Sequence, residues 1–185
     1  MHPQLQALLD DFTAARARLH RLVATVPADR FAQRPPSGGW SPAECVAHLN
    51  LTARGFIPDI QAAIEQARAR GGPAPARYRR GIIGALLVHA VSPGKGMKVK
   101  TAPSFVPNAA APAAELAAEF DRWQDAQMQL VRTADGLPID RVKVASPFDK
   151  RVKYNAFAAL SVLPRHQHRH LLQAEQAWAA VSGGG

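Results

Sequence analysis

Four stretches of this sequence carry apolar residues at helical spacing, and this pattern constrains the fold more than any other feature. They span roughly residues 4–26, 41–70, 113–134 and 154–181, and apolar residues recur in each at intervals of three and four. Each stretch therefore predicts a helix that must bury one face. Four such helices of about 20 residues each are expected to pack together, so the fold class we predict is an all-α four-helix bundle.

Local signals set the ends of these helices. Ser41 is a suitable N-cap, Pro42 suits the first helical position, and Glu44 would complete a capping box with Ser41. Two prolines lie inside the predicted helices. We expect a kink at Pro58, and at Pro164 the fourth helix is expected either to kink or to begin.

The connection between the second and third helices, residues 71–112, is too long for an idle loop in a compact domain. Apolar residues at helical spacing predict a short helix in it, near residues 78–91. We expect residues 137–153 to form a shorter, irregular connection. Residues 1–182 should form a single domain, with 183–185 as a flexible tail.

Positive charge is concentrated in this crossover and in the residues just before it. The chain has 23 Lys and Arg against 14 Asp and Glu, a net charge of +9. Residues 66–114 contain no acidic residue, and their basic residues are Arg68, Arg70, Arg77, Arg79, Arg80, Lys95, Lys98 and Lys100. This basic segment could lie over a binding site and attract an anionic co-substrate, or it could be a solvated loop. Nucleic-acid binding is disfavoured, because no recognised binding motif accompanies the charge.

Composition excludes several other classes of protein. The single cysteine, Cys45, excludes an intramolecular disulfide, a cysteine-based zinc finger and an iron–sulfur cluster. No signal-peptide core follows Met1, and the longest apolar run is too short to span a bilayer. We therefore expect a cytoplasmic protein with no membrane partner.

Three of the seven histidines lie on the apolar faces of predicted helices. His48 is on the second helix, and His166 and His170 are four residues apart on the fourth, so their imidazoles point the same way. Such a pair, joined by an imidazole from a facing helix, would hold a transition metal and leave positions open, as catalytic sites do. His168 should face elsewhere. The alternative is that these histidines are ordinary core residues or a polar helix face.

Two pairs of motifs resemble those of the DinB/YfiT-like superfamily of metal-binding bundles, which is unrelated to the translesion polymerase called DinB. The second helix opens with Trp40-Ser41-Pro42-Ala43-Glu44 and then Ala47-His48-Leu49, and the fourth carries His166-x-x-x-His170-Leu171-x-Gln173. Segments 98–107 and 146–148 resemble its connecting segments. The resemblance covers nearly the whole chain, from about residue 4 to residue 181.

This resemblance implies a bundle in up-down-down-up order and a divalent metal held by His48, His166 and His170. Zinc or nickel is expected first, with iron or manganese as alternatives. Similar proteins include S-transferases that use low-molecular-weight thiols such as bacillithiol, mycothiol or glutathione, a mycothiol-dependent isomerase and metal hydrolases, and homodimers are common. The resemblance therefore favours thiol-dependent transfer to a small electrophile. A metal-dependent hydrolase and a non-catalytic, dimeric metal- or ligand-binding bundle remain alternatives.

The chemistry of such a site needs few further residues. A three-histidine metal would lower the pKa of bound water or of a bound thiol. Glu44, one turn before His48, is expected to serve the helix end. Gln173, three residues after His170, is a candidate hydrogen-bond partner of a ligand or a contact of the substrate; the alternative is a polar residue at the rim of the bundle.

Overall fold

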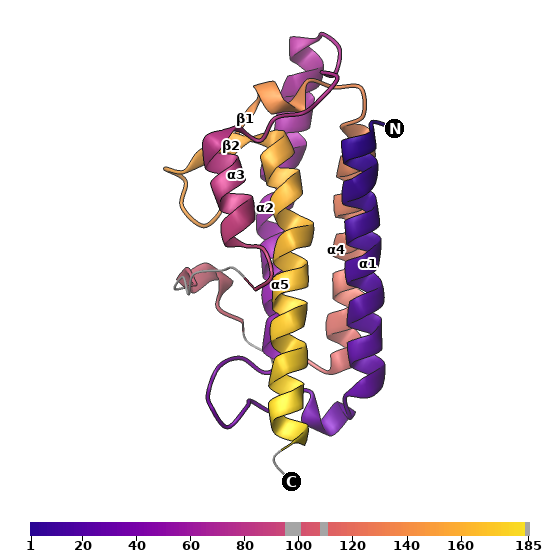
Figure 1. Cartoon of the computed structure of the whole chain (residues 1–185), viewed down its shortest axis with the longest axis vertical. Coiled ribbons are helices and arrows are strands. Elements are labelled where there is room, and N and C mark those ends of the chain that lie inside the picture. The colour runs from indigo at the N-terminus through magenta and orange to yellow at the C-terminus, as the bar shows by residue number, and fades with distance from the viewer. Residues whose placement is uncertain (95–100, 108–110, 184–185) are drawn as a thin grey trace.

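The bundle is built from four long helices packed along one another in a computed structural model that describes residues 1–94, 101–107 and 111–183 (Figure 1). The prediction of an all-α bundle is confirmed. The elements, in chain order, are α1 (Pro3–Thr25), η1 (Ala28–Arg30), α2 (Pro42–Arg70), α3 (Gly81–Ala90), η2 (Pro103–Phe105), α4 (Ala113–Thr133), η3 (Ile139–Arg141), β1 (Lys143–Ala145), β2 (Lys153–Asn155) and α5 (Ala156–Ser182).

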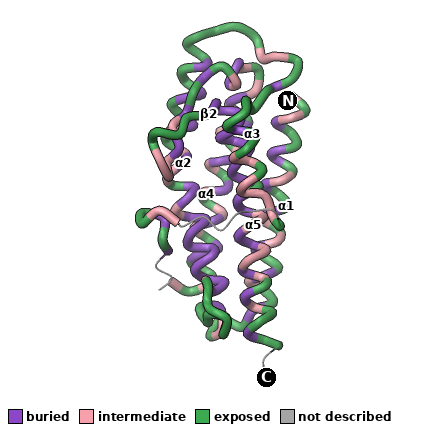
Figure 2. The backbone as a smooth tube through the Cα atoms, turned by 60° about the vertical axis from the view of Figure 1, so that its left-hand side comes forward, coloured by how far each residue is buried: buried purple, intermediate pink, exposed green. Residues whose placement is uncertain are grey.

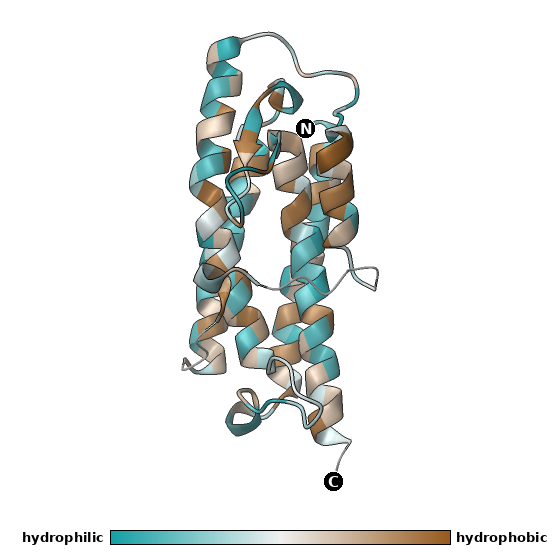
Figure 3. Cartoon of the chain, turned by 90° about the vertical axis from the view of Figure 1, so that its left-hand side faces the viewer, coloured by the Kyte–Doolittle hydropathy of each residue, from teal (hydrophilic) through white to brown (hydrophobic). Residues whose placement is uncertain are grey.

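The long helices run in two directions, and α2 lies beside α5. In Figure 1, α1 and α5 run from top to bottom, whereas α2 and α4 run from bottom to top. Both α1 and α2 pack against α4 and α5. The inward faces are buried and the outward faces exposed along each long helix (Figure 2), as amphipathic sequences require. Hydrophobic and hydrophilic residues accordingly alternate around the helices in Figure 3.

The start of α2 follows the predicted capping box. The Glu44 backbone N–H donates to Ser41 Oγ at 3.2 Å, and the Ser41 N–H donates to Glu44 Oε2 at 2.9 Å. Arg34 also binds both oxygens of the Glu44 carboxylate. Because Ser41 and Glu44 satisfy the first N–H groups, the helix start is fixed a turn and a half before His48.

The prolines inside the two helices do not end them. α2 continues through Pro58. α5 begins at Ala156, with the Asn155 side chain accepting from the Ala158 N–H at 2.8 Å, and continues through Pro164. Of the two alternatives for Pro164, a helix that begins there is therefore wrong. Packing of both helices in the bundle outweighs the backbone hydrogen bond that each proline removes.

The crossover contains the predicted short helix, α3, which lies against α5. Gly84 permits this contact: a Cβ at this position would lie 2.4 Å from the Ala158 Cβ. The opposite face of α3 exposes Ile82, Ile83 and Leu86, with exposed fractions of 82, 52 and 65%. Three basic residues of the crossover lie outside the described residues, namely Lys95, Lys98 and Lys100. So do Gly184 and Gly185 of the predicted tail.

The connection between α4 and α5 is more regular than predicted. β1 and β2 form an antiparallel pair in which Val144 faces Tyr154, and both side chains are buried. The prediction of an irregular segment is wrong here. Three-residue strands offer too few alternating positions for a period of two to stand out in the sequence.

Candidate metal centre

The packing of α2 on α5 brings three buried imidazoles together. His48 Nε2 lies 3.4 Å from His166 Nε2, and His166 Nε2 lies 3.1 Å from His170 Nε2. The three residues offer ligand atoms that all lie within 4.8 Å of one another. The i, i+4 spacing on α5 aligns two of the rings, and the facing helix supplies the third.

Hydrogen bonds at the far side of two rings decide which nitrogen carries the proton. His48 Nδ1 lies 2.8 Å from the Phe105 carbonyl oxygen, which can only accept, so Nδ1 is the donor and Nε2 presents a lone pair. His170 Nδ1 lies 3.0 Å from Gln173 Oε1 and donates to it, so its Nε2 also presents a lone pair. Both lone pairs face His166 Nε2.

These distances fit a shared metal ion. Nitrogens bonded at about 2.1 Å to one ion lie roughly 3.4 Å apart in a tetrahedral site and roughly 3.0 Å apart in an octahedral one. The two Nε2–Nε2 distances, 3.4 and 3.1 Å, fall in this range. Without an ion, His166 could donate to only one of its two neighbours. The cluster can therefore hold a metal ion through three neutral nitrogens.

Burial keeps the cluster neutral. Desolvation lowers the pKa of His48, and it lowers that of His170 to about 3, helped by the charge that His48 would carry. Desolvation, with His170 and His48 next in importance, holds the pKa of His166 well below its usual range. Since metals bind the neutral imidazole, all three side chains are ready as ligands at neutral pH.

Aromatic rings enclose the cluster. The Trp40 ring lies 4.8 Å from that of His48 and 5.7 Å from that of His170, measured between ring centroids. The centroid of the Phe148 ring lies 6.2 Å from that of His166 and 4.5 Å from that of Phe105. These rings limit the access of water and strengthen electrostatic interactions inside the site.

A sequence model of the DinB superfamily matches residues 11–174, which is most of the chain and includes all three histidines. This chain belongs to the DinB superfamily. No curated protein and no solved structure is similar enough to be matched to it. The three-histidine cluster therefore stands in a family of metal-binding proteins.

The structure of this DinB-like chain separates the candidate residues into two groups. It brings Gln173 onto His170, as described above. Three residues that are close to His48 or His170 in the sequence lie outside the cluster. Cys45 is buried among apolar residues, and desolvation raises the pKa of its thiol. Glu44 is occupied by Ser41 and Arg34. His168 contacts the Asp11 carbonyl oxygen on α1 at 3.1 Å instead.

Phe105 is the residue at the site that sequence reasoning missed. Its carbonyl fixes the tautomer of His48, and its ring occupies space that Gly55 leaves open, since a Cβ there would lie 2.9 Å from the ring. The residue falls in a segment that resembles the family, but 57 residues separate it from His48. No local spacing rule reports a contact over such a distance.

A small pocket adjoins the cluster. It has a volume of about 180 Å³ and shares Trp40 and Gln173 with the environment of the histidines. Its other lining residues come from the loop before α2 and from the last turns of α5: Pro35, Ser37, Gly38, Gly39, Gln176, Ala177 and Ala180. The pocket offers a small molecule a place beside Trp40 and Gln173, which contact His170.

We expect the metal-free protein to lose stability as the pH falls below about 6.5, which is the ordinary pKa of histidine. The unfolded chain takes up protons there, whereas His170 stays neutral in the folded state down to about pH 3. At pH 5 this difference costs about 2 kcal/mol for a fully neutral imidazole. Urea unfolding with a chelator, at about pH 7.5 and about pH 5, measures the fall.

Two variants identify the source of this fall in stability at low pH. In His170→Gln the fall in unfolding free energy between the two pH values should be smaller than in the wild type. His20→Gln, at an exposed position paired with Asp121, should keep the full fall. Equal falls in all three proteins would contradict the assignment of the pH dependence to the buried cluster.

Replacing Gln173 by leucine should weaken metal binding by roughly 10- to 100-fold, because the hydrogen bond that orients His170 is lost. Competition with a chromophoric chelator measures the affinity. Gln176→Leu is the matched control, because Gln176 lines the same pocket but makes no hydrogen bond to a histidine within the described part of the chain. Equal affinities for wild type and Gln173→Leu would reduce Gln173 to a residue of the pocket wall.

Proposed function

We propose that this DinB-superfamily protein is a metal-dependent enzyme that transfers a low-molecular-weight thiol to a small electrophile. His48, His166 and His170 would hold the divalent metal. The observation that carries the proposal is the convergence of their three Nε2 atoms. Hydrogen bonds to Phe105 and Gln173 fix the tautomers of His48 and His170, so that each Nε2 presents a lone pair. Three neutral nitrogen ligands leave positions open for a reactant.

His48, His166 and His170 would hold a divalent ion, which would supply Lewis-acid chemistry by lowering the pKa of a thiol, so that the thiolate would be available at neutral pH. In the proposed reaction the sulfur forms a bond to the electrophilic carbon, the bond from that carbon to the leaving group breaks, and the thiol proton goes to solvent. The chain's own residues serve this step by position. Phe105 orients the imidazole of His48, and Gln173 orients that of His170. Trp40 and Phe148 keep water away.

Among the described residues, the hydrogen bonds of the cluster favour a thiol over water as the nucleophile. Attack by water is assisted by a group that takes its proton. Across residues 1–94, 101–107 and 111–183, no carboxylate forms a hydrogen bond with any of the three imidazoles, and Glu44 is bound by Ser41 and Arg34. Both nucleophiles would lose a proton more readily at the metal, but a thiol starts from a pKa of about 8.5 and water from about 15.7, so the thiol depends less on a base. A metal-dependent hydrolase and a non-catalytic binding bundle are the alternatives.

The pocket beside Trp40 and Gln173 supports a small substrate. Its volume of about 180 Å³ suits a compact electrophile or one part of a thiol cofactor.

Zinc or nickel remains our first expectation for the metal, ahead of iron or manganese. The homodimer and the cytoplasmic location also stay predictions. No helix in the part of the chain that the structure describes is long and apolar enough to cross a membrane.

The test is an assay of thiol consumption with a panel of low-molecular-weight thiols and activated halides or epoxides. Turnover should require both the thiol and the metal, stop on chelation and return when zinc or nickel is added. His48→Ala should lower the rate at least about 100-fold, because one of three ligands is lost. His168→Ala is the control, since His168 faces α1.

Two results would contradict the proposal. Turnover that persists after chelation or in His48→Ala would show that the metal cluster takes no part. Metal-dependent hydrolysis of esters or amides, with no reaction of any thiol, would replace the transferase with the hydrolase.

A further inference from the structure

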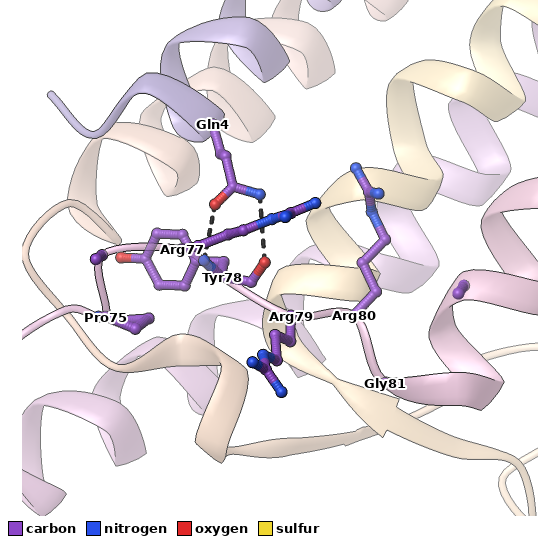
Figure 4. A pocket seen from close by; sticks show the side chains of 9 residues that line it. Gln4, Pro75, Arg77, Tyr78, Arg79, Arg80 and Gly81 are labelled. Atoms are coloured by element: carbon purple, nitrogen blue, oxygen red, sulfur yellow. Dashed lines mark hydrogen bonds between the residues drawn. The ribbon is translucent and has the colours of Figure 1, made fainter.

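A second and larger pocket lies at the other end of α5 from the small pocket. It has a volume of about 700 Å³ and lies between the start of α1 and the segment that leads into α3 (Figure 4). Its lining includes Gln4, Arg77, Tyr78, Arg79 and Arg80. Arg80 packs over the Phe157 ring. Phe157 precedes His166 on α5 by nine residues, or about 13 Å of helix, so this pocket is separate from the histidine cluster.

Three arginines line this pocket, and their charge is not neutralised by neighbouring carboxylates. None of Arg77, Arg79 and Arg80 has a carboxylate oxygen within 4.0 Å of its guanidinium in the described ranges of the chain. Arg77 and Arg80 point toward the same side of the pocket, whereas Arg79 points away (Figure 4). Burial, and then the positive charges of Arg165 and Arg77, lower the pKa of Arg80.

The acidic groups nearest to this segment are occupied elsewhere. Asp140 accepts from the Arg79 backbone N–H at 3.4 Å rather than from a guanidinium. Asp135 pairs with the amino terminus at 3.3 Å and accepts from the His2 N–H at 2.8 Å. An anion in the pocket would therefore meet uncompensated positive charge.

The backbone that carries the arginines is held from three sides. The Tyr78 N–H donates to Gln4 Oε1 at 2.7 Å, and Gln4 Nε2 donates back to the Tyr78 carbonyl at 3.3 Å (Figure 4). The Tyr78 hydroxyl donates to the Leu137 carbonyl at 2.8 Å, and Asn155 Nδ2 donates to the Arg79 carbonyl at 2.7 Å. Because the segment is already ordered, binding a ligand costs little further backbone entropy.

We propose that this pocket binds a small soluble polyanion that carries two adjacent phosphate groups. A guanidinium presents a planar fork of donors that matches two oxygens of one phosphate, and Arg77 and Arg80 together supply two such forks. A volume of about 700 Å³ leaves room for more than a single phosphate. The proposal does not depend on the reaction at the histidine cluster.

Isothermal titration calorimetry of the full chain with inorganic pyrophosphate tests this site. The protein is first freed of metal by chelation and dialysis, so that pyrophosphate meets no ion at the histidines. We expect one site per chain. Arg77→Gln/Arg80→Gln should weaken binding at least tenfold. Arg54→Gln/Arg122→Gln removes the same charge from exposed positions outside the pocket, and its affinity should stay within twofold of wild type.

Each of three results would overturn the proposal. Equal weakening in both double variants would mean that net charge alone attracts the anion. No binding of pyrophosphate by a wild type whose circular dichroism shows it to be folded would mean that the pocket takes no such ligand. Binding only to vesicles that contain phosphatidic acid, lost in Ile82→Ser/Leu86→Ser, would assign the arginines and the exposed face of α3 to a lipid surface instead.

Discussion

The contact between α2 and α5 is the interaction on which the rest of this structure depends. It buries His48 against His166 and His170 in surroundings that disfavour their charged forms. Three imidazoles then face one another with more lone pairs than protons to share, and His166 Nδ1 is buried without a hydrogen-bond partner among the described residues. Such an arrangement is costly in a core that only has to be stable, and a shared cation would compensate it.

Local sequence rules account for much of this arrangement. Helical periodicity and the Ser41–Glu44 capping box place His48 near the start of α2, and the four-residue spacing aligns His166 with His170. These rules do not determine which helices face each other, so the residues alone leave the meeting of His48 with the pair as one of two alternatives, and the family resemblance favours it. Phe105 and the strand pair lay beyond such reasoning, because contacts between distant segments depend on the packed bundle.

The basic crossover has two separate parts in the structure. η2 lies at the histidine cluster, where Phe105 contributes a carbonyl and an aromatic ring. Arg77, Arg79 and Arg80 instead line the large pocket near the start of α1. The idea that one basic segment covers the metal site is therefore too simple for the residues described. The excess charge is visible in the sequence, but only the packing of α3 on α5 shows where these arginines are held.

Metal content tests the central claim most directly. Elemental analysis of protein purified without an affinity tag should find about one divalent metal per chain, as a single three-histidine site requires. The double variant His48→Ala/His170→Ala should contain none, because only one of the three ligands remains. A wild type that holds no metal, even after addition of zinc, nickel or manganese, would contradict the account and leave these histidines as residues of the core.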